Sequence, residues 1–431
     1  MISDISSYQQ YSNNLNLSSK ELKAYQDKKI RALINHAYRN VPYYKQKLDA
    51  IGLDPSDIRN AQDLKKIPIT TKADIQFGNI QEHLASNYTD KTYRIRETSG
   101  STGKPLKIFI DYDAIRISEC IWLRAFFRNG LRIRDKLVSI GNPKNQPSQK
   151  RFFQKFGILP RSYVSIFDKP EDQLRALSIY EPDVIRCWTS CLSVLAYKKD
   201  PKYNIHPRML FTSAELLEKT TRRFLESTFG SELFDHYACE ELGLIAWECK
   251  QHSGYHVNAD SIVLEMLKDS EEVSSGEHGE IVCTHLDNFA MPIIRYKLGD
   301  MGVKGDEGCS CGLSFPKIIS IDGRNDDFIV AENGQLVSPR TVSDVLEYST
   351  NEFKNILQYR IYQVSRTELK VSLVTSAEFS NKEIIFNQVS REMKKYFGDN
   401  TEVQVEQVDS ISPDPSGKIM KVISNIKTSL N

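Results

Sequence analysis

The sequence has no long hydrophobic run and almost no net charge, and its first residues do not have the pattern of a secretory leader. No apolar stretch approaches the roughly 20 residues that a membrane-spanning helix needs. The 57 Lys and Arg residues nearly balance the 56 Asp and Glu residues, leaving a formal charge of +1. Such a chain lacks the basic surplus that holds a nucleic-acid backbone. The polar start, residues 1–5, has neither a basic region nor an apolar region of a signal peptide. We therefore expect a soluble cytoplasmic protein with no membrane insertion and no nucleic-acid partner.

Two common catalytic signatures are also missing. No Gly-x-Ser-x-Gly nucleophile elbow accompanies the eight histidines, which argues against a serine hydrolase. The P-loop of the common NTPases needs four residues between its glycines and Ser or Thr after its lysine. Here only two residues separate Gly100 from Gly103, and Pro105 follows Lys104. The segment is therefore not a P-loop.

The same segment, Thr98–Pro105, is nevertheless rich in groups that bind phosphate. Glycines allow backbone N–H groups to turn toward an anion, hydroxyls add donors, and a lysine adds positive charge. Residues 106–110, Leu-Lys-Ile-Phe-Ile, have the character of a strand. We predict a phosphate-binding loop between two strands, although the same composition alone is also typical of an ordinary turn.

The eight cysteines suggest free thiols or metal ligands more than disulfides, because disulfides are rare in long cytoplasmic chains. Cys249 and His252 have Cys-x-x-His spacing, and Cys309 and Cys311 have Cys-x-Cys spacing between two glycines, Gly308 and Gly312. Two short ligand pairs that converge are typical of structural zinc. His256 remains an alternative fourth ligand. The other cysteines show no pairing pattern and are predicted to be buried apolar residues: Cys120, Cys187, Cys191, Cys239 and Cys283.

Periodicity predicts an α/β protein with two domains. Residues 19–40 carry apolar residues at helical spacing, and Pro42 follows the end of that helix. Between about 90 and 320, β-rich runs alternate with helical stretches, which is typical of a large α/β domain. The predicted strands are 136–140, 184–187, 208–212, 262–266 and 279–284, and the predicted helices are 112–129, 171–180 and 215–229.

The pattern changes after Arg324. Residues 357–361 and 369–373 alternate as strands do, 380–397 is an amphipathic helix, and 403–405 begins another strand. We predict a large multi-sheet α/β domain over 1–325 and a small α+β C-terminal lobe over 326–431.

Four motifs in order resemble the adenylate-forming ligases that include the acyl-CoA synthetases. After the 98–105 loop come 235–243, Asp-His-Tyr-Ala-Cys-Glu-Glu-Leu-Gly, then 292–300, Pro-Ile-Ile-Arg-Tyr-Lys-Leu-Gly-Asp, and then 415–419, Pro-Ser-Gly-Lys-Ile. The N-terminal stretches 40–44 and 64–72 narrow the resemblance to the phenylacetate–CoA ligase branch. That branch includes many proteins associated with capsular polysaccharide. Several of its members carry a similar Cys/His set. The resemblance spans nearly the whole chain.

The resemblance implies roles for individual residues. Lys418 corresponds to the catalytic lysine, Glu241 to the magnesium-binding glutamate, Asp300 to the ribose-binding aspartate, and Asp326 to the hinge of a mobile lobe. The positions implied in binding ATP or AMP are Ser99, Gly100, Ser101, Thr102, Gly103, Lys104, Ser213, Ala214, Glu215, Tyr237, Asp300 and Arg324. The stretch 186–190 falls where the family shapes its adenine and acyl pockets. At Ala238 and Glu240 the family usually has Gly and Thr, so the local phosphate contacts differ here.

The implied reaction is the activation of a carboxylate by ATP with Mg²⁺, followed by displacement of AMP. CoA and an amine on a sugar or nucleotide sugar both remain open as acceptors. The segment 329–339 departs from the usual CoA-ligase hairpin and favours the polysaccharide-associated members. A catalytically silent nucleotide-binding protein is the third alternative, but retention of Lys418, Glu241 and Asp300 argues against it. The acyl substrate does not follow from the sequence, and a homodimer is left open.

Overall fold

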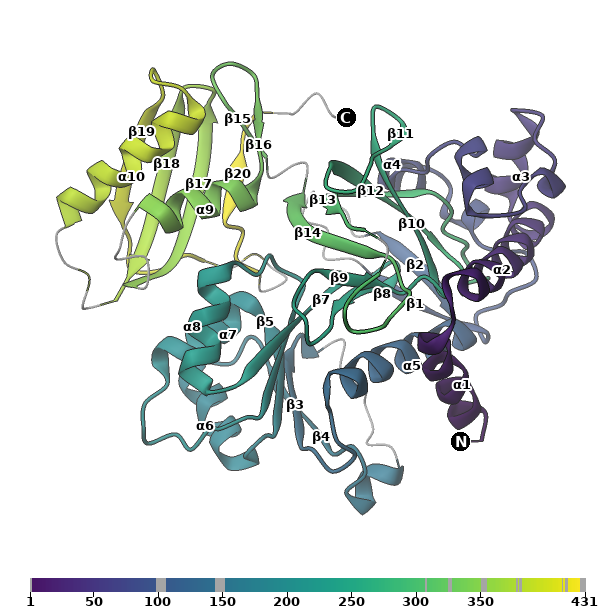
Figure 1. Ribbon diagram of the computed structural model, residues 1–431, viewed down its shortest axis with the longest axis horizontal. Helices are drawn as coiled ribbons and strands as arrows, with labels where there is room; N and C mark the ends of the chain where they lie inside the picture. Colours follow the sequence, from purple (N-terminus) through teal and green to yellow (C-terminus); the bar gives the residue numbers. More distant parts are fainter. Residues whose placement is uncertain are drawn as a thin grey trace. The chain divides into compact units, whose positions relative to one another are not determined.

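The computed structural model describes residues 2–97, 106–143, 152–306, 308–324, 328–349, 355–376, 379, 382–412, 414 and 418–426. The chain divides into two compact units, 1–130 with 236–321 and 131–235 with 322–431. Each is a mixed α/β structure (Figure 1). No helix within these described ranges is both long and apolar enough to cross a membrane.

The first unit contains the N-terminal helices and most of the antiparallel strands. Its helices are α1 (Ile2–Asn13), α2 (Ser19–Asn40), α3 (Pro42–Asp49), α4 (Lys72–Phe77) and α5 (Tyr112–Asn129). Its strands are β1 (Tyr93–Glu97), β2 (Lys107–Asp111), β8 (Gly243–Glu248), β9 (Tyr255–Val257), β10 (Ile262–Lys268), β11 (Glu271–Glu272), β12 (His278–His285) and β13 (Tyr296–Lys304). Two further strands, β7 (Glu232–Cys239) and β14 (Lys317–Arg324), cross the unit boundary.

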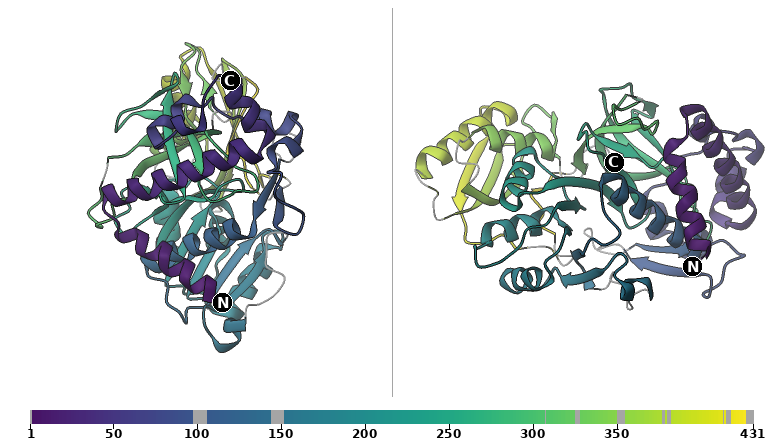
Figure 2. Two further views of the ribbon diagram at one scale, coloured as in Figure 1. Left: turned by 90° about the vertical axis from the view of Figure 1, so that its right-hand side faces the viewer. Right: turned by 60° about the horizontal axis from the view of Figure 1, so that its bottom comes forward.

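Helix α2 begins and ends where the sequence predicts. Ser18 caps its first turn and forms a reciprocal capping box with Glu21. The predicted apolar face is buried, with Ile30, Leu33 and Ile34 all 0% exposed. It packs beside α3, and the two helices lie side by side in Figures 1 and 2. This pairing buries the N-terminal segment against residues of β10 and the loop after β12.

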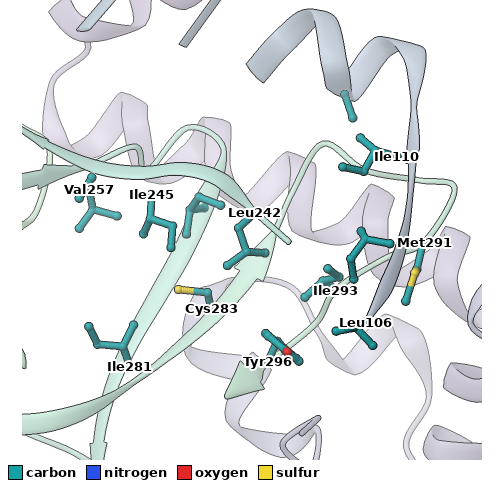
Figure 3. Packing of buried hydrophobic residues seen from close by; sticks show 14 of the residues in the cluster. Leu106, Ile110, Leu242, Ile245, Val257, Ile281, Cys283, Met291, Ile293 and Tyr296 are labelled. Carbon is teal, nitrogen blue, oxygen red and sulfur yellow. The ribbon is translucent and has the colours of Figure 1, made fainter. Parts of the chain in front are cut away.

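Strands β1 and β2 pair in antiparallel register from Tyr93↔Asp111 to Glu97↔Lys107. The predicted phosphate loop connects them, so the expected strands flank it, although the loop itself lies outside the described residues. Beneath them, side chains from β2, β8, β9 and β12 form one hydrophobic core (Figure 3). Tyr296 belongs to this core and is only 2% exposed.

The second unit begins with a parallel αβ arrangement. Strands β3 (Leu137–Gly141), β4 (Arg161–Ser165), β5 (Val184–Trp188) and β6 (Met209–Ser213) run parallel in the order β6-β5-β3-β4. Helices α6 (Pro170–Tyr180), α7 (Thr189–Lys198) and α8 (Lys219–Phe229) pack on them through a core that includes Leu174, Leu192 and Leu225. Helix α8 starts at Lys219, four residues after the predicted start at 215.

The C-terminal part of this unit is an α+β sheet structure with its own core. Its elements are β15 (Ile329–Val330), β16 (Leu336–Val337), α9 (Pro339–Ser349), β17 (Ile356–Ser365), β18 (Glu368–Thr375), α10 (Lys382–Phe397), β19 (Glu402–Gln407) and β20 (Val422–Ser424). The sheet order is β19-β18-β17-β20, and α9 and α10 pack together against it (Figure 1). These bounds confirm the α/β class and the predicted strands and helix of this part of the chain.

Candidate active site

The carboxyl ends of β5 and β6 bring two predicted site segments together. The strands are parallel neighbours with Trp188 opposite Ser213, so the residues that follow each strand emerge at one edge. Open parallel sheets bind ligands at this edge. Ser190, in the first turn of α7, and Glu215, two residues after β6, meet there.

Glu215 holds the N-terminus of α7. Its carboxylate accepts the Ser190 N–H at 2.6 Å and the Ser190 hydroxyl at 2.8 Å. The N-cap residue Trp188 supplies no side-chain acceptor, so Glu215 satisfies a donor that the helix leaves unpaired. Burial raises the pKa of Glu215, and the two Ser190 hydrogen bonds offset this only in part.

Ala214 has a left-handed backbone at φ 72°, which is uncommon for a residue with a Cβ. It is exposed, whereas its neighbour Ser213 is buried at the end of β6. Strained backbone tends to occur at ligand sites. The conformation fits the predicted presentation of backbone groups at this position.

Lys418 lies against the same edge. Its backbone N–H donates to Asp414 Oδ1 at 3.0 Å, and its carbonyl accepts the Asp414 N–H at 2.8 Å, so Asp414 fixes both backbone polar groups of Lys418. The next residue, Ile419, donates its N–H to Glu215 Oε1 at 3.4 Å. The Lys418 ammonium lies 5.8 Å from the centroid of the Trp188 ring. The structure thus brings Lys418 and Glu215, which are 203 positions apart, to one place.

Tyr237 and Asp300 meet within the first unit. Tyr237, near the end of β7, donates its hydroxyl to Asp300 Oδ2 of β13 at 2.6 Å. Burial and then the Asp300 carboxylate raise the pKa of Tyr237 far above its ordinary value. The phenol therefore remains protonated, and it orients the aspartate as a hydrogen-bond donor.

Glu241 lies in the turn between β7 and β8. The buried Tyr296 hydroxyl donates to Glu241 Oε1 at 3.5 Å, which ties the carboxylate to the hydrophobic core beneath it. Glu241 and Glu240 are both partly exposed. A solvent-accessible carboxylate that a buried neighbour restrains is a suitable ligand for a hard cation.

Several predicted positions belong to neither of these two groups of residues. Arg324 is an exposed residue at the end of β14. The hinge Asp326 and the loop residues Ser99, Gly100, Ser101, Thr102, Gly103 and Lys104 lie outside the described residues. Their roles stay predictions.

A Cys/His cluster forms in the first unit, with one change from the predicted set. Cys249, His256, Cys309 and Cys311 place their ligand atoms within 4.8 Å of one another. Gly308 and Gly312 have φ values of 97° and 84°, which permit the tight turn around the cysteines.

His256, the alternative ligand, thus replaces His252 in the cluster. β9 pairs with β14 so that His256 lies opposite Lys317, near the loop that carries Cys309 and Cys311. His252 instead places its Nδ1 3.5 Å from Glu248 Oε2, in the turn after β8. The histidine of the cluster therefore comes from strand β9 and not from the Cys-x-x-His turn.

Sequence reasoning missed three residues beside Lys418. Glu218, Tyr359 and Lys421 form a buried hydrogen-bonded group that links α8 to β17 and to the residue before β20. The one available signal was the position of Lys421 three residues after Lys418, since nothing in a sequence pairs it with Glu218.

Comparison with known proteins finds similar sequences over most of the chain. Residues 329–425 match the CapK C-terminal domain family. The phenylacetate-coenzyme A ligase of Escherichia coli strain K12 is 26% identical over 430 residues, which cover 94% of this chain and 95% of that protein. The phenylacetate-coenzyme A ligase of Thermus thermophilus is 26% identical over 351 residues, covering 77% of this chain and 76% of that protein.

Solved structures share the fold at lower identity. 2-Hydroxyisobutyryl-CoA ligase in complex with 2-HIB-AMP superposes with a TM-score of 0.80 at 18% identity, covering 96% of this chain and 91% of that one. An anthranilate CoA ligase in complex with anthranoyl-AMP has a TM-score of 0.57 at 14% identity, covering 75% of this chain and 64% of that one.

Proposed function

Because the chain is similar over most of its length to phenylacetate-coenzyme A ligases, we propose that it belongs to the adenylate-forming superfamily, in its phenylacetate–CoA ligase branch, and is an AMP-forming carboxylate–CoA ligase. It would activate a carboxylic acid with ATP as an acyl-adenylate and then transfer the acyl group to CoA. One observation carries the proposal: the turn with Lys418 lies on the edge formed by Trp188, Ser190 and Glu215. A lysine held over a strained, partly exposed segment suits a site where negative charge develops.

Lys418 is the proposed catalytic residue of the first step. Its ammonium would stabilise the charge that develops on the carboxylate and the α-phosphate as the carboxylate oxygen attacks phosphorus and pyrophosphate leaves. Glu215 acts through the backbone, because its carboxylate holds both the start of α7 and the Ile419 N–H. Glu215 therefore positions the turn that carries the lysine.

In the first unit, Asp300 is suited to orienting the ribose of a nucleotide. A carboxylate accepts hydrogen bonds from two hydroxyls at once, which suits the ribose. Tyr237 keeps Asp300 in one orientation through a short hydrogen bond. Ala214, exposed and left-handed, would present backbone to the adenine.

Glu241 fits a magnesium site by its donor chemistry. It is a hard oxygen ligand that is partly exposed and anchored by Tyr296. Bound Mg²⁺ would neutralise charge on the ATP phosphates. Glu241 would hold that cation while its contact with Tyr296 restrains the carboxylate.

The C-terminal part of the chain is the reason for proposing a second possible acceptor of the acyl group. Residues 329–425 match the CapK C-terminal domain, and 329–337 form the short β15–β16 hairpin. The sequence also resembles capsule-associated members of the branch, and for that reason we propose an amine on a sugar or nucleotide sugar as the alternative acceptor. Both candidates share the adenylation step and differ only in the nucleophile that displaces AMP.

Pyrophosphate release by the purified chain tests the function. We expect release with ATP, Mg²⁺ and one pool among aryl, fatty, hydroxy and amino acids, with continuous turnover only when CoA is added. A burst that stalls with CoA and continues with amines or amino sugars would identify the alternative acceptor. No release from any pool, together with no ATP binding, would contradict the proposal.

The Cys/His cluster fits a structural zinc ion. The Cys249 and Cys309 sulfurs are 3.8 Å apart, close to the edge of a tetrahedron with zinc–sulfur bonds of about 2.3 Å. Cys311 Sγ lies 3.3 Å from His256 Nε2, and the other ring nitrogen, Nδ1, lies 3.2 Å from the Phe315 carbonyl. Such a second contact fixes the orientation of a ligating imidazole. Three thiolates and one imidazole would close the shell, so zinc here would be structural.

We predict about one zinc ion per chain, held by His256 and independent of His252. His256→Ala should lose most of the zinc measured by elemental analysis and melt at a lower temperature, because structural zinc contributes to folding stability. His252→Ala is the matched control and should keep its zinc. Equal zinc content in both variants, or none in the wild type, would refute the site.

A further inference from the structure

A second acidic residue of the same edge contacts the C-terminal part of the chain. Glu218 lies directly before α8, and its Oε1 accepts the Lys421 ammonium at 2.6 Å and the Tyr359 hydroxyl at 2.7 Å. Thr221 donates its hydroxyl to the other carboxylate oxygen at 3.0 Å. One carboxylate therefore joins α8 to β17 and to the residue that precedes β20.

Because Glu218 and Lys421 are largely buried, one arrangement of the two side chains is strongly preferred. The Glu218 side chain is 3% exposed, and Lys421 is 23% exposed. Burial alone would raise the pKa of Glu218, but the Lys421 ammonium and the hydrogen bonds around it bring the pKa below its ordinary value. A buried carboxylate without its cation is costly, so the arrangement with Lys421 in place is strongly preferred.

The pair fixes a short piece of backbone. Lys421 precedes Val422, which begins β20 opposite Ile361 of β17, two residues beyond Tyr359. Three residues upstream is Lys418, and between them the Ile419 N–H reaches Glu215. The segment 418–421 is thus held at Ile419 by Glu215 and at Lys421 by Glu218.

The two contacts differ in strength. The Ile419 hydrogen bond to Glu215 is long, at 3.4 Å, whereas the charge-assisted contact of Lys421 with Glu218 is short. Tyr197 of α7 adds a hydrogen bond to the Ile356 carbonyl at 3.3 Å, which is also long. Of these three contacts, the one between Glu218 and Lys421 is therefore the strongest polar restraint on how the Lys418 segment meets this edge.

We propose that Glu218 is a positioning residue for adenylate formation, which acts through Lys421 and Tyr359 to seat Lys418 at the edge formed by β5 and β6. The inference rests on the proposed function, in which Lys418 serves the first half-reaction. Glu218 itself touches neither substrate nor reacting atoms. Its role predicts a loss confined to the step that uses Lys418.

Three substitutions test the seating by different chemistry. Glu218→Gln removes the charge and keeps the shape, Lys421→Met removes the partner, and Tyr359→Phe removes one hydroxyl. We expect kcat for acyl-adenylate formation, measured by hydroxylamine trapping, to fall about 10–100-fold for the first two, since small misplacements of a catalytic group are costly. The KM for ATP and the rate of acyl transfer from synthetic acyl-adenylate to CoA should change little.

Two controls separate seating from general damage. Lys421→Arg keeps the charge and should retain most of the activity. Glu171→Gln removes a glutamate from the exposed Lys198–Glu171 pair of the same unit and should change neither step. If Glu218→Gln does not fold, Tyr359→Phe and Lys421→Arg still test the proposal, with a smaller loss of adenylation expected from the first than from Lys421→Met.

A readout without catalysis separates this proposal from the proposed function. Amide hydrogen exchange of residues 418–424 and 356–365 should be faster in Glu218→Gln and Lys421→Met than in wild type, and unchanged in Glu171→Gln. If the wild type forms no adenylate but the variants still differ from it in exchange as expected, the proposed function is refuted and the structural role of the Glu218 contact is supported. Unchanged exchange, or equal losses in both half-reactions, would overturn the positioning role.

Discussion

Lys418→Ala is expected to lower the rate of acyl-adenylate formation by about 10²–10³-fold, the typical loss when one charge-stabilising group is removed. The side chain would act on charge that develops on the α-phosphate, so the loss should appear in kcat more than in the KM for ATP. Hydroxylamine trapping of the acyl-adenylate, with the acid found in the pyrophosphate assay, measures the step directly.

The same substitution should lower the free energy of unfolding by no more than about 1 kcal/mol. The Lys418 ammonium makes a cation–π contact with Trp188 at 5.8 Å, and such contacts contribute about 0.5–1 kcal/mol when they are partly exposed. The turn is held by backbone and Asp414 contacts that alanine preserves. Lys202→Ala, which removes an exposed lysine of the same unit, is the control and should leave both activity and melting unchanged. Wild-type adenylation by Lys418→Ala would remove this lysine from the mechanism.

The second large effect is expected on folding. Asp260→Ala should lower the free energy of unfolding by about 3–5 kcal/mol, because it leaves the Arg124 guanidinium buried without its counter-ion. Both side chains are fully buried, with two contacts of 2.6 and 2.7 Å between them. Asn14 donates to the same carboxylate at 2.8 Å, and Arg124 also donates to the Tyr11 carbonyl at 2.7 Å. The Arg124–Asp260 pair therefore connects α5 to the loop after β9. It also binds Tyr11 of α1 and Asn14, the residue that follows α1.

The denaturant midpoint at unchanged slope measures this loss. Asp113→Ala breaks an exposed pair with Arg116 on the same helix and should cost no more than about 1 kcal/mol. Burial would raise the pKa of Asp260, but Arg124 holds it below its ordinary value. This stabilisation is present above the unfolded-state pKa and is lost as the pH falls through the folded-state pKa. A midpoint shift for Asp260→Ala no larger than that of Asp113→Ala would contradict the assignment.

The sequence predicted the elements well where one period is sustained. The apolar spacing of residues 19–40 and of 380–397 corresponds to α2 and α10, and the alternation at 357–361 and 369–373 corresponds to β17 and β18. These patterns depend only on neighbours along the chain. Helix α8 was extended too far because Glu215 lies outside it and serves as an acceptor for α7.

Contacts between distant segments could not be predicted in this way. His256 joins the cysteines because β9 pairs with β14, and ligand spacing along the chain carries no information about that pairing. Glu218 and Lys421 are 203 residues apart, and both resemble ordinary surface residues in a sequence. The motif that contains Lys418 could be recognised in the sequence by its resemblance to a family. The residues proposed to position Lys418 could be found only in the structure.

The position of the Cys/His cluster relative to β8 has an evolutionary consequence. Glu241 precedes this strand and Cys249 follows it, so an extended six-residue strand, roughly 20 Å long, separates them. At that distance the cluster can hold the β8–β9 turn but would not touch a substrate bound at the proposed Glu241 site. Selection on the proposed chemistry would therefore act on the first end of the strand. A lineage could exchange the four cluster residues for well-packed apolar residues without changing that end, so Cys/His content should vary among relatives more freely than Glu241.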